Sequence, residues 1–310
     1  MTYAMLFPGQ GSQAVGMLAS HTAPVVADTL REAGEVLGWD LSALIATGPA
    51  EELNRTERTQ PALLACEIAL WRLWQQQGLP PPAALAGHSL GEYAALVAAG
   101  SLGFHDALRL VELRGRLMQA AVPAGTGGMA AVIGLEDAQV EALCRSYTGG
   151  EVLEPVNYNA PGQVVVAGQS GALDWLAANG KAHGARMVMR LPVSVPSHCS
   201  LMREAAGQLA EALQSLHLHP PAIPVAHNLD ATPRTEVDGI RQALREQLYR
   251  PVRWTQTIQG YGAAGIRTFV ECGPGKVLGG LNKRILKESV SLALEDAEGL
   301  EKARQTVGVG

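Results

Sequence analysis

The chain has 310 residues, of which 47% are hydrophobic and 17% charged, and its formal net charge is −5 at pH 7. A chain of this size and composition can bury a large core as one big domain or two unequal ones, so disorder is not expected. The sequence contains no long basic block. This charge pattern argues against nucleic acid or an anionic membrane as the main partner.

Two uncharged runs, residues 117–135 and 155–173, are long enough to raise the question of a membrane span. Pro and several Gly interrupt both runs, so we expect a soluble structure. The N-terminus has no basic region or cleavage signal, and the four cysteines form no C-x-x-C pair. We therefore expect no disulfide, no metal site and a location in the reducing cytoplasm.

Short apolar runs alternate with helical patterns along the chain. Residues 3–7 predict a strand, and residues 61–74 have helical spacing, with Pro61 early and Gly78 as the stop signal. This alternation predicts an α/β fold with a mainly parallel sheet. The later elements are a strand ending near Gly87, a helix from about Leu90 and strands at 223–226 and 268–272.

The pattern changes between residues 125 and 194, where the order becomes β, α, β, β, α, β. This order is ferredoxin-like. Both edges of the segment, T-G-G at 126–128 and S-V-P-S at 194–197, contain hinge-prone residues. We therefore predict an inserted ferredoxin-like small subdomain at 125–194, within a large, α/β-hydrolase-like catalytic subdomain formed by 1–124 and 195–310.

The motif G-H-S-L-G places Ser89 between Gly87 and Gly91, after an apolar run and before a helical one. This strand, turn and helix context is the one that a nucleophile elbow requires. Small neighbours allow the strand and helix to approach closely while the serine hydroxyl projects outward. The alternative is that Ser89 only caps the helix.

A serine hydroxyl needs a base to take its proton, so the histidines are the next candidates. His198, in V-P-S-H-C-S, follows Ser89 in the chain order of hydrolases; its alternative is a buried structural role. His88 lies inside the elbow and could only orient the turn. No carboxylate stands out as a third member, so a dyad and a triad both remain open. Surface positions are expected for His21, His183, His217 and His219.

The loop F-P-G-Q-G-S-Q-A at 7–14 fits the loose dinucleotide fingerprint G-x-G-x-x-A. The segment after this loop is helix-like to about Leu37, however, and no acidic residue falls at the end of a second strand. We favour a loop that directs donors toward a developing oxyanion, with Gln10 as one donor and the N–H of Leu90 as the other.

Seven motifs occur in order along nearly the whole chain and together resemble the bacterial malonyl-CoA:acyl carrier protein transacylase family. Any one of them is a weak signal, but the ordered set is specific. The motifs are G-Q-G-S-Q, G-H-S-L-G-E-Y, V-E-L-R-G, N-Y-N-A-P-G-Q-V-V-V-A-G, V-P-S-H-C, Q-L-Y-R-P-V-R-W and E-C-G-P-G-K-V-L.

The resemblance implies roles for individual residues. Ser89 would take the acyl group, with His198 as general base and then general acid. The main-chain carbonyl of Gln247 would orient the histidine, and Arg114 would pair with the malonyl carboxylate. Without the resemblance, Arg114 would be interpreted as a helix-surface arginine. The oxyanion-hole positions would be Gln10 and Leu90, and the residues lining or bracing the site would be Met129, Asn157 and Asn159.

The implied reaction is ping-pong transfer of a malonyl group from malonyl-CoA to the phosphopantetheine thiol of holo acyl carrier protein, which supplies fatty acid biosynthesis. No metal or redox cofactor, nucleic acid or membrane is expected to take part, and a monomer is expected. Acyl carrier protein is usually acidic, so a local basic patch is expected; a solvated helix face is the alternative. Candidates are Lys276, Lys283, Arg284 and Lys287.

Other functions remain open at this point. A serine esterase or thioesterase would share Ser89 and His198 but would have no use for Arg114. A transacylase subunit of a malonate-decarboxylating complex, or an acyltransferase domain of a polyketide synthase, would share every motif. A non-catalytic module that binds the carrier protein is the remaining alternative.

Overall fold

A computed structural model describes residues 2–123 and 125–308 of the chain. The predicted boundary at residue 124 and the chain ends at residues 1 and 309–310 lie outside the described residues. The main sheet has the strand order β7-β2-β1-β8-β9, and its strand pairs are all parallel. Its strands are β1 (Tyr3–Phe7), β2 (Ala84–Gly87), β7 (Val225–Ala226), β8 (Thr268–Glu271) and β9 (Val290–Ala293).

The main sheet is covered on both faces, as expected for strands that read as continuous apolar runs. In β1, Tyr3, Met5 and Phe7 pack into one hydrophobic cluster, and the alternate residues Ala4 and Leu6 pack into another. Side chains of a parallel strand alternate between faces, so this division follows from the extended backbone.

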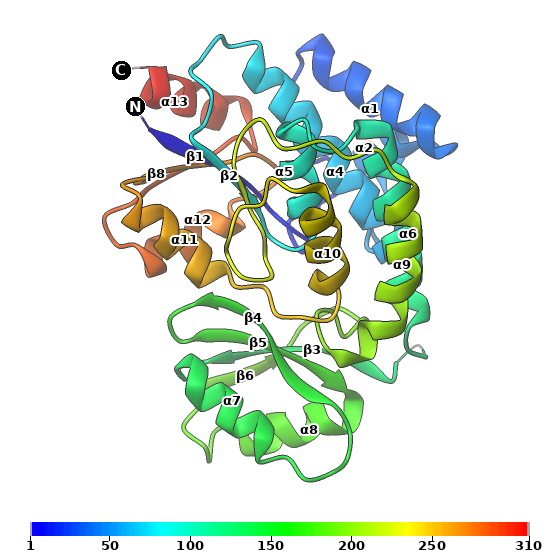
Figure 1. Cartoon of the computed structure of the whole chain (residues 1–310), viewed down its shortest axis with the longest axis vertical. Helices are drawn as coiled ribbons and strands as arrows, with labels where there is room; N and C mark the ends of the chain where they lie inside the picture. The colour runs from blue at the N-terminus through cyan, green and yellow to red at the C-terminus, as the bar shows by residue number, and fades with distance from the viewer. Residues whose placement is uncertain (1, 124, 309–310) are drawn as a thin grey trace.

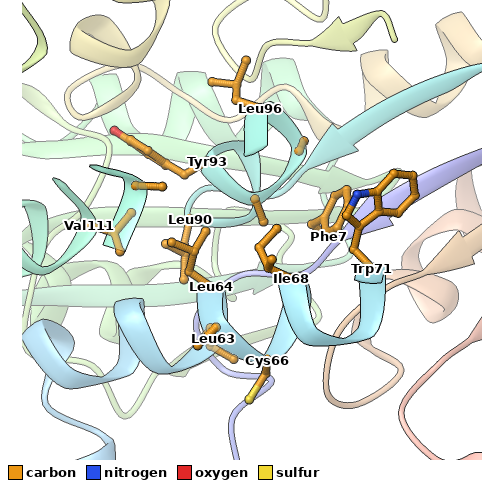
Figure 2. Packing of buried hydrophobic residues seen from close by; sticks show 14 of the residues in the cluster. Phe7, Leu63, Leu64, Cys66, Ile68, Trp71, Leu90, Tyr93, Leu96 and Val111 are labelled. Atoms are coloured by element: carbon orange, nitrogen blue, oxygen red, sulfur yellow. The ribbon is translucent and has the colours of Figure 1, made fainter. Parts of the chain in front are cut away.

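The helices of this part flank the sheet (Figure 1). They are α1 (Pro24–Leu37), α2 (Leu41–Thr47), α3 (Ala50–Leu53), α4 (Thr56–Gln75), α5 (Gly91–Ala98), α6 (Phe104–Ala120), α9 (Arg203–Ser215), α10 (Val237–Gln247), α11 (Trp254–Ala263), α12 (Val277–Ile285) and α13 (Ala297–Gly308), with a 3₁₀ turn at Ser200–Met202. Figure 2 shows Leu64 and Ile68 of α4 directed toward Phe7 and Leu90, in the larger of the hydrophobic clusters.

A second sheet of four antiparallel strands lies at the opposite end of the molecule (Figure 1). Its strand order, β4-β5-β3-β6, is the ferredoxin-like arrangement, and helices α7 and α8 pack on it. The predicted combination of a mainly parallel α/β sheet with a ferredoxin-like unit is confirmed. The elements are β3 (Gly127–Ile133), α7 (Asp137–Arg145), β4 (Leu153–Ala160), β5 (Gln163–Gln169), α8 (Ser170–Asn179) and β6 (Met187–Arg190).

Main-chain hydrogen bonds join the small sheet to the segment that follows α10. Tyr158 N donates to Val252 O at 3.0 Å, and Val252 N donates to Val156 O at 2.8 Å. Strand β4 therefore pairs with the segment that follows α10, which fixes the small sheet against the part of the chain that carries Gln247.

Three predicted elements differ in detail from the structure. The segment after the 7–14 loop is not helical until α1 begins at Pro24, because turns with positive φ at Gly16 and Leu18 interrupt it. The strand predicted at 223–226 is only Val225–Ala226. Helix α4 begins at Thr56, before the expected start at residue 61, so Pro61 lies within the helix.

None of the helices in residues 2–123 and 125–308 is both long enough and apolar enough to span a bilayer. The four cysteines are buried and free.

Candidate active site

Three neighbouring strands of the parallel sheet end beside one another and carry candidate residues just beyond their carboxyl ends. Gln10 follows β1, Ser89 follows β2 and Asn228 follows β7. The carboxyl edge of a parallel sheet is where α/β proteins usually place a site, because the loops there converge. The topology therefore brings together residues far apart in sequence.

The glycines around Ser89 are required by close backbone contacts. A Cβ on Gly87 would lie 1.8 Å from the carbonyl carbon of Gly91, and a Cβ on Gly91 would lie 2.1 Å from Phe7 O. Ser89 itself has a φ of 53°, a left-handed conformation that costs a non-glycine residue about 1–3 kcal/mol. Ser89 does not cap the helix: Leu90 is the N-cap residue of α5, with no side-chain capping bond.

Ser89 and His198 are in hydrogen-bond contact. Ser89 Oγ lies 2.8 Å from His198 Nε2, and His198 Nδ1 lies 2.6 Å from the main-chain oxygen of Gln247. A carbonyl oxygen only accepts hydrogen bonds, so the imidazole hydrogen is on Nδ1 and Nε2 is left as the acceptor. The orienting group is thus a main-chain carbonyl, and no carboxylate occupies that position.

The imidazole of His198 is held in its neutral form. Its side chain is buried, with an exposed fraction of 2%. Burial lowers its pKa to about 3, the positive charge of Arg114 contributes to the lowering, and the bond to Gln247 partly opposes it. Nε2 is therefore free to take a proton from Ser89 at any ordinary pH.

Arg114 extends from α6 into the interior, contrary to the interpretation as a surface arginine, and its exposed fraction is 0%. It donates to Gln60 Oε1 at 2.7 Å, to Gln247 Oε1 at 3.0 Å and to Ser89 Oγ at 3.3 Å. No ion pair joins it to a carboxylate within the described part of the chain. Burial lowers its pKa, which Tyr93 and Glu92 partly offset.

The two predicted oxyanion donors lie on opposite sides of the serine turn in sequence. Gln10 is exposed, and its Oε1 accepts a hydrogen bond from Thr56 Oγ1 at 3.1 Å. This bond uses the amide oxygen and leaves the amide nitrogen of Gln10 to donate to another acceptor. Leu90 is buried directly after Ser89. Its N–H has no hydrogen-bond partner among residues 2–123 and 125–308.

The small sheet contributes the remaining candidates, and these differ in how they contact the residues around Ser89 and His198. Asn159 Oδ1 lies 2.8 Å from His88 Nε2, so Asn159 braces the residue before Ser89. Asn157 is buried, and its Oδ1 has no partner among the described residues. Met129 packs in a small hydrophobic cluster that includes Cys199, the residue after His198.

Four buried polar residues around Ser89 were missed by sequence reasoning. Asn228 bonds to the main chain at the start of the serine turn: its Oδ1 accepts from Ser89 N at 2.7 Å and its Nδ2 donates to Gly87 O at 2.6 Å. The signals in the sequence were weak: a polar pair, His227 and Asn228, follows an apolar run, and Glu92 comes directly after the elbow motif. The missed residues are Gln60, Glu92, His227 and Asn228.

One surface prediction is wrong. His21 has an exposed fraction of only 8%, and its Nε2 lies 2.9 Å from Leu294 O, because the segment before α1 packs against the end of β9. The other three are exposed as predicted: His183, His217 and His219.

This fold, with a serine on a strained turn, a histidine and a buried arginine, defines an acyl transferase. The acyl transferase domain family model matches residues 4–304, and the chain belongs to that family. A malonyl CoA-acyl carrier protein transacylase of Salmonella typhimurium is 52% identical over 303 residues, which cover 97% of this chain and 98% of the relative. One from Bacillus subtilis is 42% identical, covering 98% and 96%. The resemblance to bacterial transacylases is confirmed.

Solved structures agree with these relatives. An acyl carrier protein S-malonyltransferase from Vibrio cholerae superposes with a TM-score of 0.95 at 53% identity, covering 98% of this chain and all of the other. A malonyl-transacylase in complex with a type II polyketide synthase acyl-carrier protein gives a TM-score of 0.97 at 48% identity, covering 99% of this chain and all of the other.

Proposed function

We propose that this protein transfers a malonyl group from malonyl-CoA to the phosphopantetheine thiol of an acyl carrier protein, in support of fatty acid biosynthesis. The observation that carries the proposal is the buried Arg114, which donates to Ser89 Oγ while having amide partners and no carboxylate ion pair within the described residues. A buried cation beside a nucleophile suits an acyl group that brings its own carboxylate. The relatives named above carry this same activity in their names.

In the first half-reaction, Ser89 Oγ attacks the thioester carbonyl and His198 Nε2 takes its proton. The N–H of Leu90 and the amide of Gln10 would stabilise the oxyanion of the tetrahedral intermediate. When the intermediate collapses, the C–S bond breaks, the CoA thiolate takes the proton from His198, and the malonyl group remains on Ser89 as an ester. The carrier thiol then attacks that ester, and the same proton transfers run in reverse.

Arg114 would hold the free carboxylate of the malonyl group through charge-assisted hydrogen bonds. Asn159 and His88 would brace the serine turn, and Met129 and Asn157 would line the acyl site. A serine thioesterase would use Ser89 and His198 equally well but gives no reason for a buried arginine beside the nucleophile. A transacylase subunit of a malonate-decarboxylating complex remains compatible with the same residues and differs in its carrier partner.

The finer organisation is proposed on the same basis. Residues 125–194 would form the inserted small subdomain, because β3 to β6 all fall within this segment. The carrier protein would meet basic side chains on and around α12, where Lys283 and Lys287 are exposed, whereas Lys276 pairs with Glu295 and Arg284 bonds to Gln163. Free buried cysteines fit a cytoplasmic enzyme. A monomer is the assembly we propose.

Intact-mass measurement tests the proposal. After incubation with malonyl-CoA, the wild-type protein should gain one malonyl mass, and holo acyl carrier protein should then remove it. Ser89→Ala should show no gain, because the group that forms the ester is absent. Labelling that survives this substitution would overturn the assignment of the nucleophile. Rapid loss of the label to water without carrier protein would instead identify a thioesterase.

A further inference from the structure

Glu92 lies one helical turn after Ser89, and its carboxylate is fully buried, with an exposed fraction of 0%. Three donors surround it. Its Oε1 lies 2.7 Å from His227 Nδ1, and its Oε2 accepts from Asn228 N and from Gln247 Nε2, each at 2.9 Å. These donors come from the loop after β7 and from the end of α10, so one carboxylate joins both segments to the elbow helix.

The first of these segments holds the serine turn. Glu92 fixes the main chain of Asn228, whose side chain accepts from Ser89 N at 2.7 Å and donates to Gly87 O at 2.6 Å. A left-handed serine persists only where surrounding contacts over-determine it. Asn228 supplies two such contacts where the chain enters the turn, and its own main-chain N donates to Glu92.

The second segment holds the arginine. Gln247 Nε2 donates both to Glu92 Oε2 and to Ser89 O, each at 2.9 Å, while Gln247 Oε1 accepts from Arg114. Glu92 Oε2 accepts hydrogen bonds both from Asn228 N and from Gln247 Nε2, so Glu92 holds the amide nitrogen of Gln247 toward itself. The amide oxygen must then face Arg114, which fixes the direction of the guanidinium. An amide in place of Glu92 would permit the flipped arrangement.

We propose that Glu92 is a positioning residue for acyl selection, because it fixes Asn228 at the serine turn and Gln247 against Arg114. This inference rests on the proposed function, since it assumes that Arg114 receives a carboxylate on the acyl group. Its distinctive consequence is that Glu92 controls the preference for malonyl over acetyl thioesters, although it touches neither substrate. A buried Glu92–His227 pair that only stabilised the fold would have no such effect.

The test uses Glu92→Gln, which keeps the shape of the side chain but replaces one acceptor with a donor. Acylation by malonyl-CoA should fall by about 100-fold and acylation by acetyl-CoA by about tenfold, because both depend on the serine turn but only malonyl depends on Arg114. The ratio of the two kcat/KM values should therefore fall about tenfold. Glu92→Asp, which keeps a carboxyl group with two acceptor oxygens, should restore part of this ratio.

Glu271→Gln is the matched control. Glu271 is also a buried carboxylate, but it accepts from Leu278 N and Gly279 N at the start of α12, and within the described residues it has no hydrogen bond to Ser89, Asn228 or Gln247. This variant should lower the melting temperature without changing the malonyl to acetyl ratio. An unchanged ratio in a folded Glu92→Gln protein would overturn the proposal, whatever happened to stability.

A double-mutant cycle with Arg114→Met identifies the route. If Glu92 acts on selectivity through Arg114, Glu92→Gln should not change the ratio further in the Arg114→Met background. An equal tenfold change in both backgrounds would overturn the proposed route. If Glu92→Gln does not fold, Gln247→Met takes its place: it keeps the carbonyl that orients His198, and it should lower the same ratio, whereas an unchanged ratio would overturn the proposal.

The proposed function and the positioning role fail differently in these assays. A wild-type protein that gains no malonyl mass would overturn both. A wild-type protein that is malonylated at Ser89, with unchanged selectivity in Glu92→Gln and Gln247→Met, would overturn the positioning role alone.

Discussion

Two regions beside the parallel sheet each contain a fully buried glutamate, but the hydrogen bonds of the two carboxylates differ. Beside Ser89, Glu92 receives three hydrogen bonds and lies near the buried cation Arg114. Beside the end of β8, Glu67 on α4 is equally buried, but neither of its carboxylate oxygens has a hydrogen-bond partner among residues 2–123 and 125–308.

The difference shows that two carboxylates buried to the same degree can have very different hydrogen-bond environments. Burial raises the pKa of Glu67 well above its usual value, and the nearby Glu271 raises it further. Burial also raises the pKa of Glu271, to about 7, although the main-chain N–H groups at the start of α12 partly oppose the shift. The carboxylate beside Ser89 is thus matched by hydrogen-bond donors, whereas the region around Glu67 favours the protonated forms of its two carboxyl groups.

Removing His198 is the largest expected disturbance of the region around Ser89. His198→Ala should slow the malonylation of Ser89 by about 100- to 10,000-fold, the usual effect of losing a general base, while the fold is retained. Rapid-quench measurement of ester formation, with circular dichroism for folding, checks this. A nearly normal rate would mean that another group takes the proton from Ser89.

Replacing Arg114 should separate charge recognition from chemistry. Arg114→Ala should cost about 2–5 kcal/mol in malonyl transfer, because the substrate carboxylate would be desolvated without a partner. Acetyl transfer should change little. Arg114→Lys should recover part of the malonyl activity, since an ammonium group lacks the two-pronged geometry of a guanidinium.

The measurement is kcat/KM for both thioesters on the wild type and both variants. Equal losses for malonyl and acetyl groups would show that Arg114 supports the structure or binds the CoA portion. The substrate assignment would then depend on the relatives alone.

The region around Glu67 leads to a prediction about stability and pH. The raised pKa of Glu67 means that above about pH 4.5 the unfolded chain releases this proton while the folded protein keeps it. The free energy of unfolding should therefore fall by about 1.4 kcal/mol per pH unit through this group, from pH 4.5 up to the folded-state pKa. Glu67→Met has no such ionisable group. Its free energy of unfolding should therefore exceed that of the wild type by an amount that grows between pH 5 and 8.

Urea denaturation at several pH values measures this advantage. Glu298→Met, at an exposed position on α13, serves as the control and should show no such growth with pH. A stability difference between Glu67→Met and the wild type that is constant with pH would indicate that Glu67 is ionised in the folded protein.

The sequence was sufficient for the features that depend on local pattern. The alternation of apolar runs predicted the parallel sheet, and G-H-S-L-G predicted the tight turn, because both signals lie within a few consecutive residues. The resemblance to the transacylases pointed to Arg114 and Gln247, which pattern alone would have left as ordinary helix residues. In the structure, Arg114 donates to Ser89 Oγ and to Gln247 Oε1, and the main-chain oxygen of Gln247 contacts His198 Nδ1.

The interior polar contacts were not predictable in this way. Glu92 and Gln247 are 155 positions apart in sequence, and nothing near either residue indicates that they meet. His21 was misassigned for the same reason, because its acceptor, Leu294 O, lies 273 positions away. Burial of a polar side chain is decided by tertiary partners, which periodicity does not encode.

His198 lies beside the C-terminal end of α10, and this position has an electrostatic consequence. Its ring Nδ1 meets Gln247 O, and its main-chain N donates to Leu248 O at 2.9 Å, so the histidine is anchored to the last carbonyls of this helix. The C-terminus of a helix carries a partial negative charge that stabilises a cation by about 0.3–2 kcal/mol. The imidazolium that forms in each half-reaction would be supported by peptide dipoles. Unlike an aspartate, these dipoles cannot be neutralised by acid, and they are lost only if the final turn of α10 unwinds.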